Sequence, residues 1–90
     1  MLDLKRAKEL LDAGRWDDAV EMLNAFICEN PDSDDAYFLL GNAYLKKEDW
    51  QSALNNYQKA IDLNENSSAR HAYRATTEIL EFYNKDMFNQ

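Results

Sequence analysis

Residues 16–31 read W-D-D-A-V-E-M-L-N-A-F-I-C-E-N-P, and this stretch decides the fold. Its apolar side chains recur three and four residues apart, which places them on one face of an α-helix. Residues 50–65, W-Q-S-A-L-N-N-Y-Q-K-A-I-D-L-N-E, show the same intervals 34 residues further on. The two stripes are Trp16, Ala19, Val20, Leu23, Phe26 and Ile27, and Trp50, Ala53, Leu54, Tyr57, Ala60 and Ile61. The chain therefore contains a helical unit that occurs twice.

Three further amphipathic segments complete the pattern. A shorter one precedes each stripe, and a longer one follows the second unit from Ser68 onward. Their apolar residues are Leu4, Ala7, Leu10 and Leu11; Tyr37, Leu40, Gly41 and Tyr44; and Ala69, Ala72, Tyr73, Thr76, Ile79, Leu80 and Tyr83. Because the connections are short, successive helices must pack antiparallel. We predict an all-α fold of five helices, built from antiparallel helix-turn-helix repeats and a terminal helix.

The residues between these segments are typical of helix ends. Asn30-Pro31 stops a helix, since the residue before proline is displaced from helical conformation, and Asp32 or Ser33 can cap the next helix. Asp49 is the expected N-cap of the last helix of the second unit. The remaining connections are Gly14-Arg15, Glu48-Asp49 and the stretch from Asn64 to Ser68, with Ser67 and Ser68 as cap candidates.

Composition narrows the class of protein. The 90 residues suit one domain with one core, and only 2 Gly and 1 Pro favour helices. Seventeen acidic residues against 10 basic ones give a net charge of −7, which repels phosphate backbones and anionic lipids. We therefore expect no nucleic acid and no membrane among the partners. A single cysteine, Cys28, and the absence of a signal-like or membrane-spanning run predict a cytoplasmic location.

The second unit resembles the tetratricopeptide repeat family, whose pattern runs W-x2-L-G-x2-Y, then A-x3-F, then P. It has Tyr37-x2-Leu40-Gly41-x2-Tyr44 and Ala53-x3-Tyr57, with Glu65 at the proline position. The first unit is looser. It has Ala7, Leu10, Ala19-x3-Leu23 and Pro31 in register, while Asp3 and Arg6 depart from the aromatic and leucine positions. We interpret the chain as one domain, 1–90, with repeats at 1–33 and 34–67, a capping helix at 68–85 and a frayed tail at 86–90.

The resemblance implies a concave groove, lined by the first helix of each repeat, that holds a peptide or helix of another protein. By register its residues are Leu4, Lys8, Leu11, Asp12, Phe38, Asn42, Leu45 and Lys46, and the fifth helix would add Ala69, Ala72 and Thr76. The alternative is that the apolar members only pack against the next helix. Some members bind C-terminal carboxylates through a clamp of lysines, asparagines and an arginine. Leu4 and Leu39 occupy two of those positions, so we do not predict that activity.

Nothing in the sequence predicts a catalytic, cofactor or metal site. His71 is the only histidine and has no Cys or second His at ligand spacing, and Ser67 and Ser68 lack the glycines of a nucleophile elbow. Trp16 and Trp50 occupy equivalent repeat positions, which favours packing at the turn between helices. On the fifth helix we expect Ala72, Thr76 and Ile79 to pack on the second repeat.

Two functional hypotheses remain. The first is an adaptor that binds a partner protein in the groove. The second is a structural protein that self-associates, because two and a half repeats leave apolar ends and the terminus carries Phe82, Tyr83, Met87 and Phe88. An enzyme is the least supported reading, since no nucleophile, base and pocket can be named.

Overall fold

The structure is a computed structural model that describes the backbone of residues 3–88 and the side chains of residues 3–82. The described residues form five α-helices in chain order, which confirms the predicted all-α fold. They are α1 (Leu4–Asp12), α2 (Trp16–Glu29), α3 (Asp34–Lys46), α4 (Trp50–Leu63) and α5 (Ala69–Phe88). The last helix extends to Phe88, beyond residue 85, where we predicted its end from the sequence.

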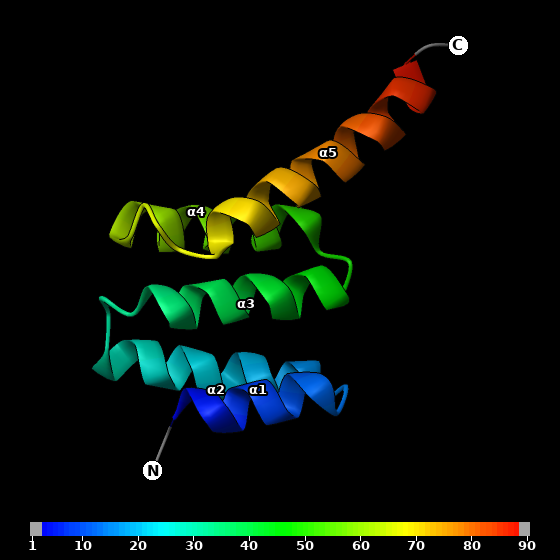
Figure 1. Ribbon diagram of the computed structural model, residues 1–90. Helices are drawn as coiled ribbons and strands as arrows, with labels where there is room; N and C mark the ends of the chain where they lie inside the picture. Colours follow the sequence, from blue (N-terminus) through cyan, green and yellow to red (C-terminus); the bar gives the residue numbers. More distant parts are fainter. Residues whose placement is uncertain (1–2, 89–90) are drawn as a thin grey trace.

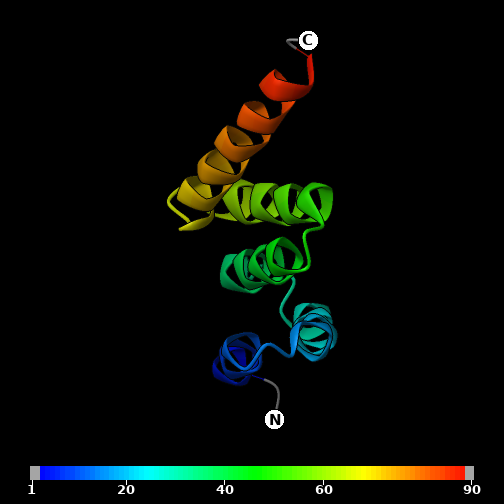
Figure 2. The ribbon, with the colours of Figure 1, turned by 90° about the vertical axis from the view of Figure 1, so that its right-hand side faces the viewer.

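The helices stack in sequence as antiparallel neighbours. Each contacts the next, and α3 with α4 forms the most extensive pair. Figures 1 and 2 show α1 and α2 side by side at one end, α3 and α4 above them, and α5 leaving the stack at an angle. The result is an elongated molecule of 52 × 28 × 17 Å, with the two ends of the chain far apart.

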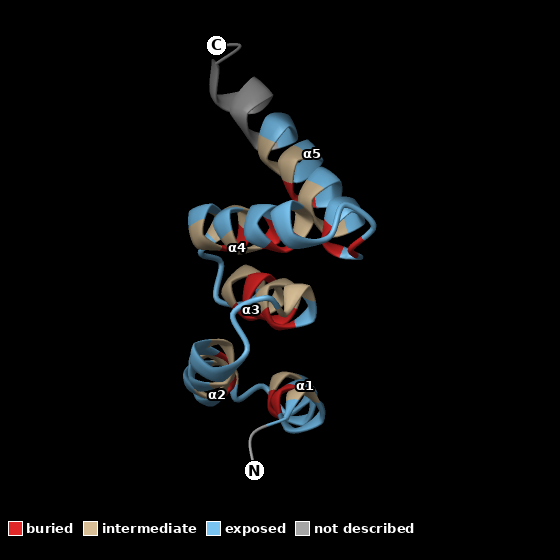
Figure 3. Cartoon of the chain, turned by 90° about the vertical axis from the view of Figure 1, so that its left-hand side faces the viewer, coloured by how far each residue is buried: buried red, intermediate tan, exposed pale blue. Residues whose placement is uncertain are grey.

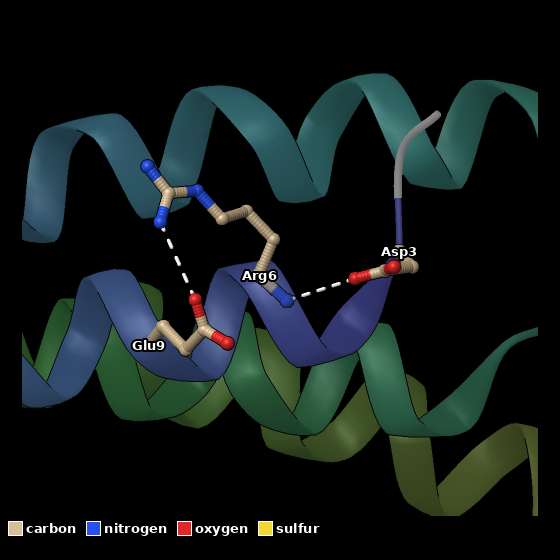
Figure 4. Close-up of polar contacts among 3 residues, drawn as sticks. All are labelled: Asp3, Arg6 and Glu9. Carbon is tan, nitrogen blue, oxygen red and sulfur yellow. Dashed lines mark hydrogen bonds and ion pairs between the residues drawn. The ribbon is translucent and has the colours of Figure 1, made fainter.

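Side-chain caps begin three of the helices. The predicted cap Asp49 accepts a hydrogen bond from the Ser52 amide at 3.2 Å, and Ser33 accepts one from the Ala36 amide at 3.2 Å. Asp3 accepts from the Arg6 amide at 2.8 Å at the start of α1, and Arg6 in turn pairs with Glu9 at 3.3 Å (Figure 4). These bonds satisfy amides that have no partner within the helix.

The turns inside the two repeats share one backbone shape. Gly14 has a φ of 78°, and Glu48 at the equivalent position has a φ of 62°. This left-handed conformation suits glycine and is unfavourable for a residue with a Cβ. The position after it differs as well, because Arg15 makes no side-chain cap for α2 whereas Asp49 caps α4.

Small residues allow the two helices of each repeat to approach closely. A Cβ on Gly41 would overlap the ring of Tyr57, which is fully buried. In the first repeat the equivalent residues are Ala7 and Leu23, both fully buried in one cluster. Ala7 has a methyl group where Gly41 has only a hydrogen, and its partner Leu23 is correspondingly smaller than Tyr57. Figure 3 shows the buried positions on the facing sides of the helices.

Polar contacts link elements that are distant in sequence. Lys47, after α3, forms an ion pair with Asp17 in α2, and this hydrogen bond raises the pKa of Lys47. Lys47 Nζ also lies 5.8 Å from the centre of the Tyr44 ring. At the other end of the stack Asn64 Nδ2 donates to Asp34 Oδ2 at 3.2 Å. These bonds join equivalent ends of neighbouring helices.

The terminal helix corrects two expectations. Ala69 and Thr76 are 0% and 1% exposed, so they cannot line an open groove. Ile79, expected to pack on the second repeat, is 43% exposed, because α5 diverges from α4 along its length. Thr76 does pack as predicted, and its hydroxyl donates to the Ala72 carbonyl at 2.7 Å. The side chains of Tyr83, Met87 and Phe88 lie outside the described residues.

Candidate functional site

A shallow hollow of about 300 Å³ lies between the first helices of the two repeats. Residues of α1 and α3 line it: Lys8, Leu11, Asp12, Leu39, Asn42, Leu45 and Lys46. Six of these are among the eight groove residues expected from the repeat register. The structure therefore brings most of the predicted residues together around one depression.

The repeat explains why these side chains meet. Both α1 and α3 run antiparallel to α2, so they lie parallel to each other and in contact. Residues 34 positions apart then stand at the same level, as Leu11 does with Leu45 and Asp12 with Lys46. One face of each first helix is thereby presented to the same space.

The hollow has an apolar floor and a polar rim. Leu39 is buried, and Leu11 and Leu45 are half-buried against the core. Lys8, Asp12 and Lys46 are exposed at the edge. Such a combination can hold an apolar side chain while charged groups contact its neighbours.

Asn42 has a defined orientation in this hollow. Its Oδ1 accepts a hydrogen bond from Tyr57 Oη at 2.6 Å. Burial raises the pKa of Tyr57 to about 12, so the phenol keeps its proton at neutral pH. With Oδ1 engaged, the amide nitrogen of Asn42 is the group that can donate to a ligand.

Leu4 and Phe38 are the predicted groove residues that do not line the hollow. Both are half-buried and pack against the core. The ring of Phe38 lies 6.1 Å from that of Tyr57, between the two core clusters. For these two residues the structure agrees with the alternative of packing within the fold.

Leu39 is the lining residue that the groove register missed. It lies three residues before Asn42 and seven before Lys46, which is one side of a helix. That spacing was readable in the sequence. Leu39 also belongs to the hydrophobic core. That it both packs in the core and lines the hollow depends on how α1 crosses α3.

A larger and more polar hollow, of about 650 Å³, lies at the start of α5. It is lined by Asn66, Ser67, Ser68, Arg70, His71, Tyr73 and Arg74. Ser67 is buried, and its hydroxyl accepts a hydrogen bond from the Ala69 amide at 3.1 Å just before α5 begins. Arg70 Nη1 donates to the Glu65 carbonyl at 3.3 Å, so part of this surface holds the α4–α5 connection in place.

Other chemistry is sparse in the part of the chain that the structure describes. No group of three His, Cys, Asp or Glu side chains there has the geometry of a metal site. No helix among the described residues has the length and apolar character needed to cross a membrane. Cys28 is exposed, and Trp16 and Trp50 are half-buried at equivalent places.

Comparisons with known proteins agree with this arrangement. A tetratricopeptide repeat family model matches residues 4–68, and no catalytic family is indicated. The solution NMR structure of the Bacteroides fragilis protein BF1650 is 50% identical, with a TM-score of 0.88, over 100% of this chain and 92% of that one. No curated protein matches the chain. Domains of the matched family are generally protein-interaction modules. With two repeats and a fifth helix after them, the chain belongs to the tetratricopeptide repeat family.

Proposed function

We propose that this protein is an adaptor whose α1–α3 hollow binds a short segment of a partner protein. The observation that carries the proposal is the apolar floor of Leu11, Leu39 and Leu45 under a polar rim. The family generally binds proteins, which supports a binding role over a catalytic one. A cytoplasmic location stays a prediction from the single cysteine.

The chemistry of the hollow indicates what the segment contains. Its volume of about 300 Å³ is at the lower end for ligand pockets, so it takes an apolar anchor and not a whole domain. Lys8 and Lys46 outnumber Asp12 on the rim, which favours a carboxylate beside that anchor. Asn42 offers its amide nitrogen to a carbonyl of the segment.

Two double variants of equal charge change test the site. Lys8→Glu with Lys46→Glu reverses the rim of the hollow. Lys5→Glu with Lys59→Glu reverses two exposed lysines that do not line it. Peptides selected from a random displayed library on the native protein are synthesised and titrated by fluorescence polarisation against all three proteins.

We expect the rim variant to lose at least about tenfold in affinity and the control variant to stay near the native value. Amide chemical shifts should move at the hollow on addition of peptide, above all for Leu11, Leu39 and Asn42. Failure to select any peptide, or equal weakening by the two double variants, would contradict the proposal.

A further inference from the structure

The outer face of α5 carries two neighbouring rows of exposed side chains. In each row the residues are four, four and three positions apart, so each row follows one line along the helix. The charged row is Arg70, Arg74, Glu78 and Glu81. The second row is His71, Ala75, Ile79 and Phe82. Apart from His71 the second row is apolar, and this apolar row runs directly beside a line of ordered charge.

The apolar row lies on the side of α5 that does not pack on α4. Ala69 and Thr76, on the side of the helix that faces α4, are buried. Ile79 and Phe82 are 43% and 65% exposed, and both belong to the half of α5 that diverges from the stack (Figures 1 and 3). Large apolar side chains in line at one end of a molecule are typical of an interaction surface.

The charged row is ordered by sign. Its two arginines come first and its two glutamates follow, so one half is basic and the other acidic. Arg74 Nε and Glu78 Oε1 are 4.0 Å apart, and their side chains are 81% and 68% exposed. An ion pair this exposed contributes little to the helix, so both groups can pair with charges of another molecule.

We infer that a second copy of this chain docks on this face, with the two α5 helices antiparallel. A two-fold axis then passes midway between Ala75 and Ile79, so Ala75 of one copy lies opposite Ile79 of the other and His71 lies opposite Phe82. Such an interface is isologous, because the same patch is used twice. It goes beyond the proposed peptide site, which lies on α1 and α3.

The charge order selects the antiparallel arrangement. In an antiparallel pair of helices related by a two-fold axis, the charged row of one copy lies beside the charged row of the other copy. The two rows run in opposite directions. Arg70 and Arg74 then meet Glu81 and Glu78 of the second copy. In a parallel pair the charged row would instead face the opposite flank, whose Ala72 and Thr76 carry no charge. Only the antiparallel pair therefore matches opposite signs.

The net charge of the protein makes the pairing of arginines with glutamates between the two copies important. Each copy carries a net charge of −7, so two copies repel one another at long range. Association on this face needs local pairs of opposite charge to offset that repulsion. The ordered row supplies them beside the apolar contact.

Two charge variants test the inference together. An acidic-row variant carries Arg70→Glu and Arg74→Glu, and a basic-row variant carries Glu78→Arg and Glu81→Arg. Light scattering with size-exclusion chromatography is run on the native chain, each variant and their equimolar mixture at high micromolar concentration. Circular dichroism checks that each variant keeps the native helix content.

We expect the native chain and the mixture to be dimers and each variant alone to be a monomer. Pairing within the mixture also shows that both variants are folded. A native chain that stays monomeric overturns the inference. So do variants that dimerise alone, or a mixture that stays monomeric.

Cysteine cross-linking separates the two orientations. In a Cys28→Ser background, Ala75→Cys lies nearest to the two-fold axis of the antiparallel pair and should oxidise readily to a covalent dimer. His71→Cys lies far from its own copy in that pair and should not. Equal cross-linking at both positions would mean a parallel pair and would overturn the proposed arrangement.

Discussion

Single residues decide how closely the helices of each repeat approach. Gly41 lies against the buried ring of Tyr57, while the first repeat combines Ala7 with Leu23. The two repeats thus fill the same space with different pairs of residues. Protein interiors are packed densely enough that one methyl group must be compensated by its neighbour.

Gly41→Ala should therefore destabilise the protein by about 2 kcal/mol, because overpacking forces the Tyr57 ring to move. The second change, Tyr57→Leu, recreates the pair found in the first repeat. In a double-mutant cycle measured by urea denaturation, the two changes together should cost at least about 1 kcal/mol less than their sum.

Ala7→Gly is the matched control in the first repeat. It opens space beside Leu23 without creating a clash, so its effect should not depend on the residue at position 57. Strict additivity of Gly41→Ala and Tyr57→Leu would show that the ring does not limit the approach of α3 and α4.

At the scale of the element, helix starts differ between the repeats although the backbone does not. Arg15 before α2 has φ and ψ of −93° and 67°, and Asp49 before α4 has −93° and 81°. Only Asp49 carries a side chain that can accept from the helix amides. The backbone at Arg15 thus has the conformation of a capped helix start, but the arginine side chain cannot accept the capping hydrogen bond.

Arg15→Ser should stabilise the protein by about 1 kcal/mol, the usual contribution of an N-cap serine. The change removes the ion pair of Arg15 with Asp18, at 2.6 Å, but both groups are largely exposed and the loss is small. The midpoint of thermal unfolding measures the effect.

The converse change, Asp49→Ala, should destabilise α4 by a similar amount, because it removes an existing cap. An Arg15→Ser protein that unfolds at or below the native temperature would mean that the turn around Gly14 cannot hold a capping side chain in place.

At the scale of the whole molecule, stability depends on neighbours covering one another. Each described helix packs against the next one along the chain, α1 also contacts α3, and α5 packs on α4. Tyr57, Ala60 and Ala69 belong to one buried cluster that spans these two helices. The terminal helix is therefore part of the core of the second repeat.

Ending the chain after Ser68 should lower the free energy of unfolding by at least about 2 kcal/mol, since it uncovers apolar side chains of α4. Urea denaturation followed by circular dichroism measures the loss. An unchanged urea midpoint would show that the two repeats are stable without α5.

Much of this architecture could be predicted from the sequence. The spacing of apolar residues predicted five helices in antiparallel order, and the cap Asp49 followed from residue type and position. For α3 the sequence offered Asp32 or Ser33, and the structure has Ser33 as the cap. These features depend on neighbours in the chain, so a linear pattern contains them. The register likewise predicted six residues that line the hollow.

Other features depended on how one helix crosses another. Phe38 and Leu45 both lie on the predicted groove face, yet only Leu45 lines the hollow and Phe38 packs on Tyr57. Thr76 and Ile79 are neighbours on one stripe, yet Thr76 is buried and Ile79 is exposed. The spacing of residues along the sequence tells which residues lie on the same face of a helix. Only the tertiary structure decided which part of that face a neighbour covers, because coverage depends on the crossing angle and on where two helices part.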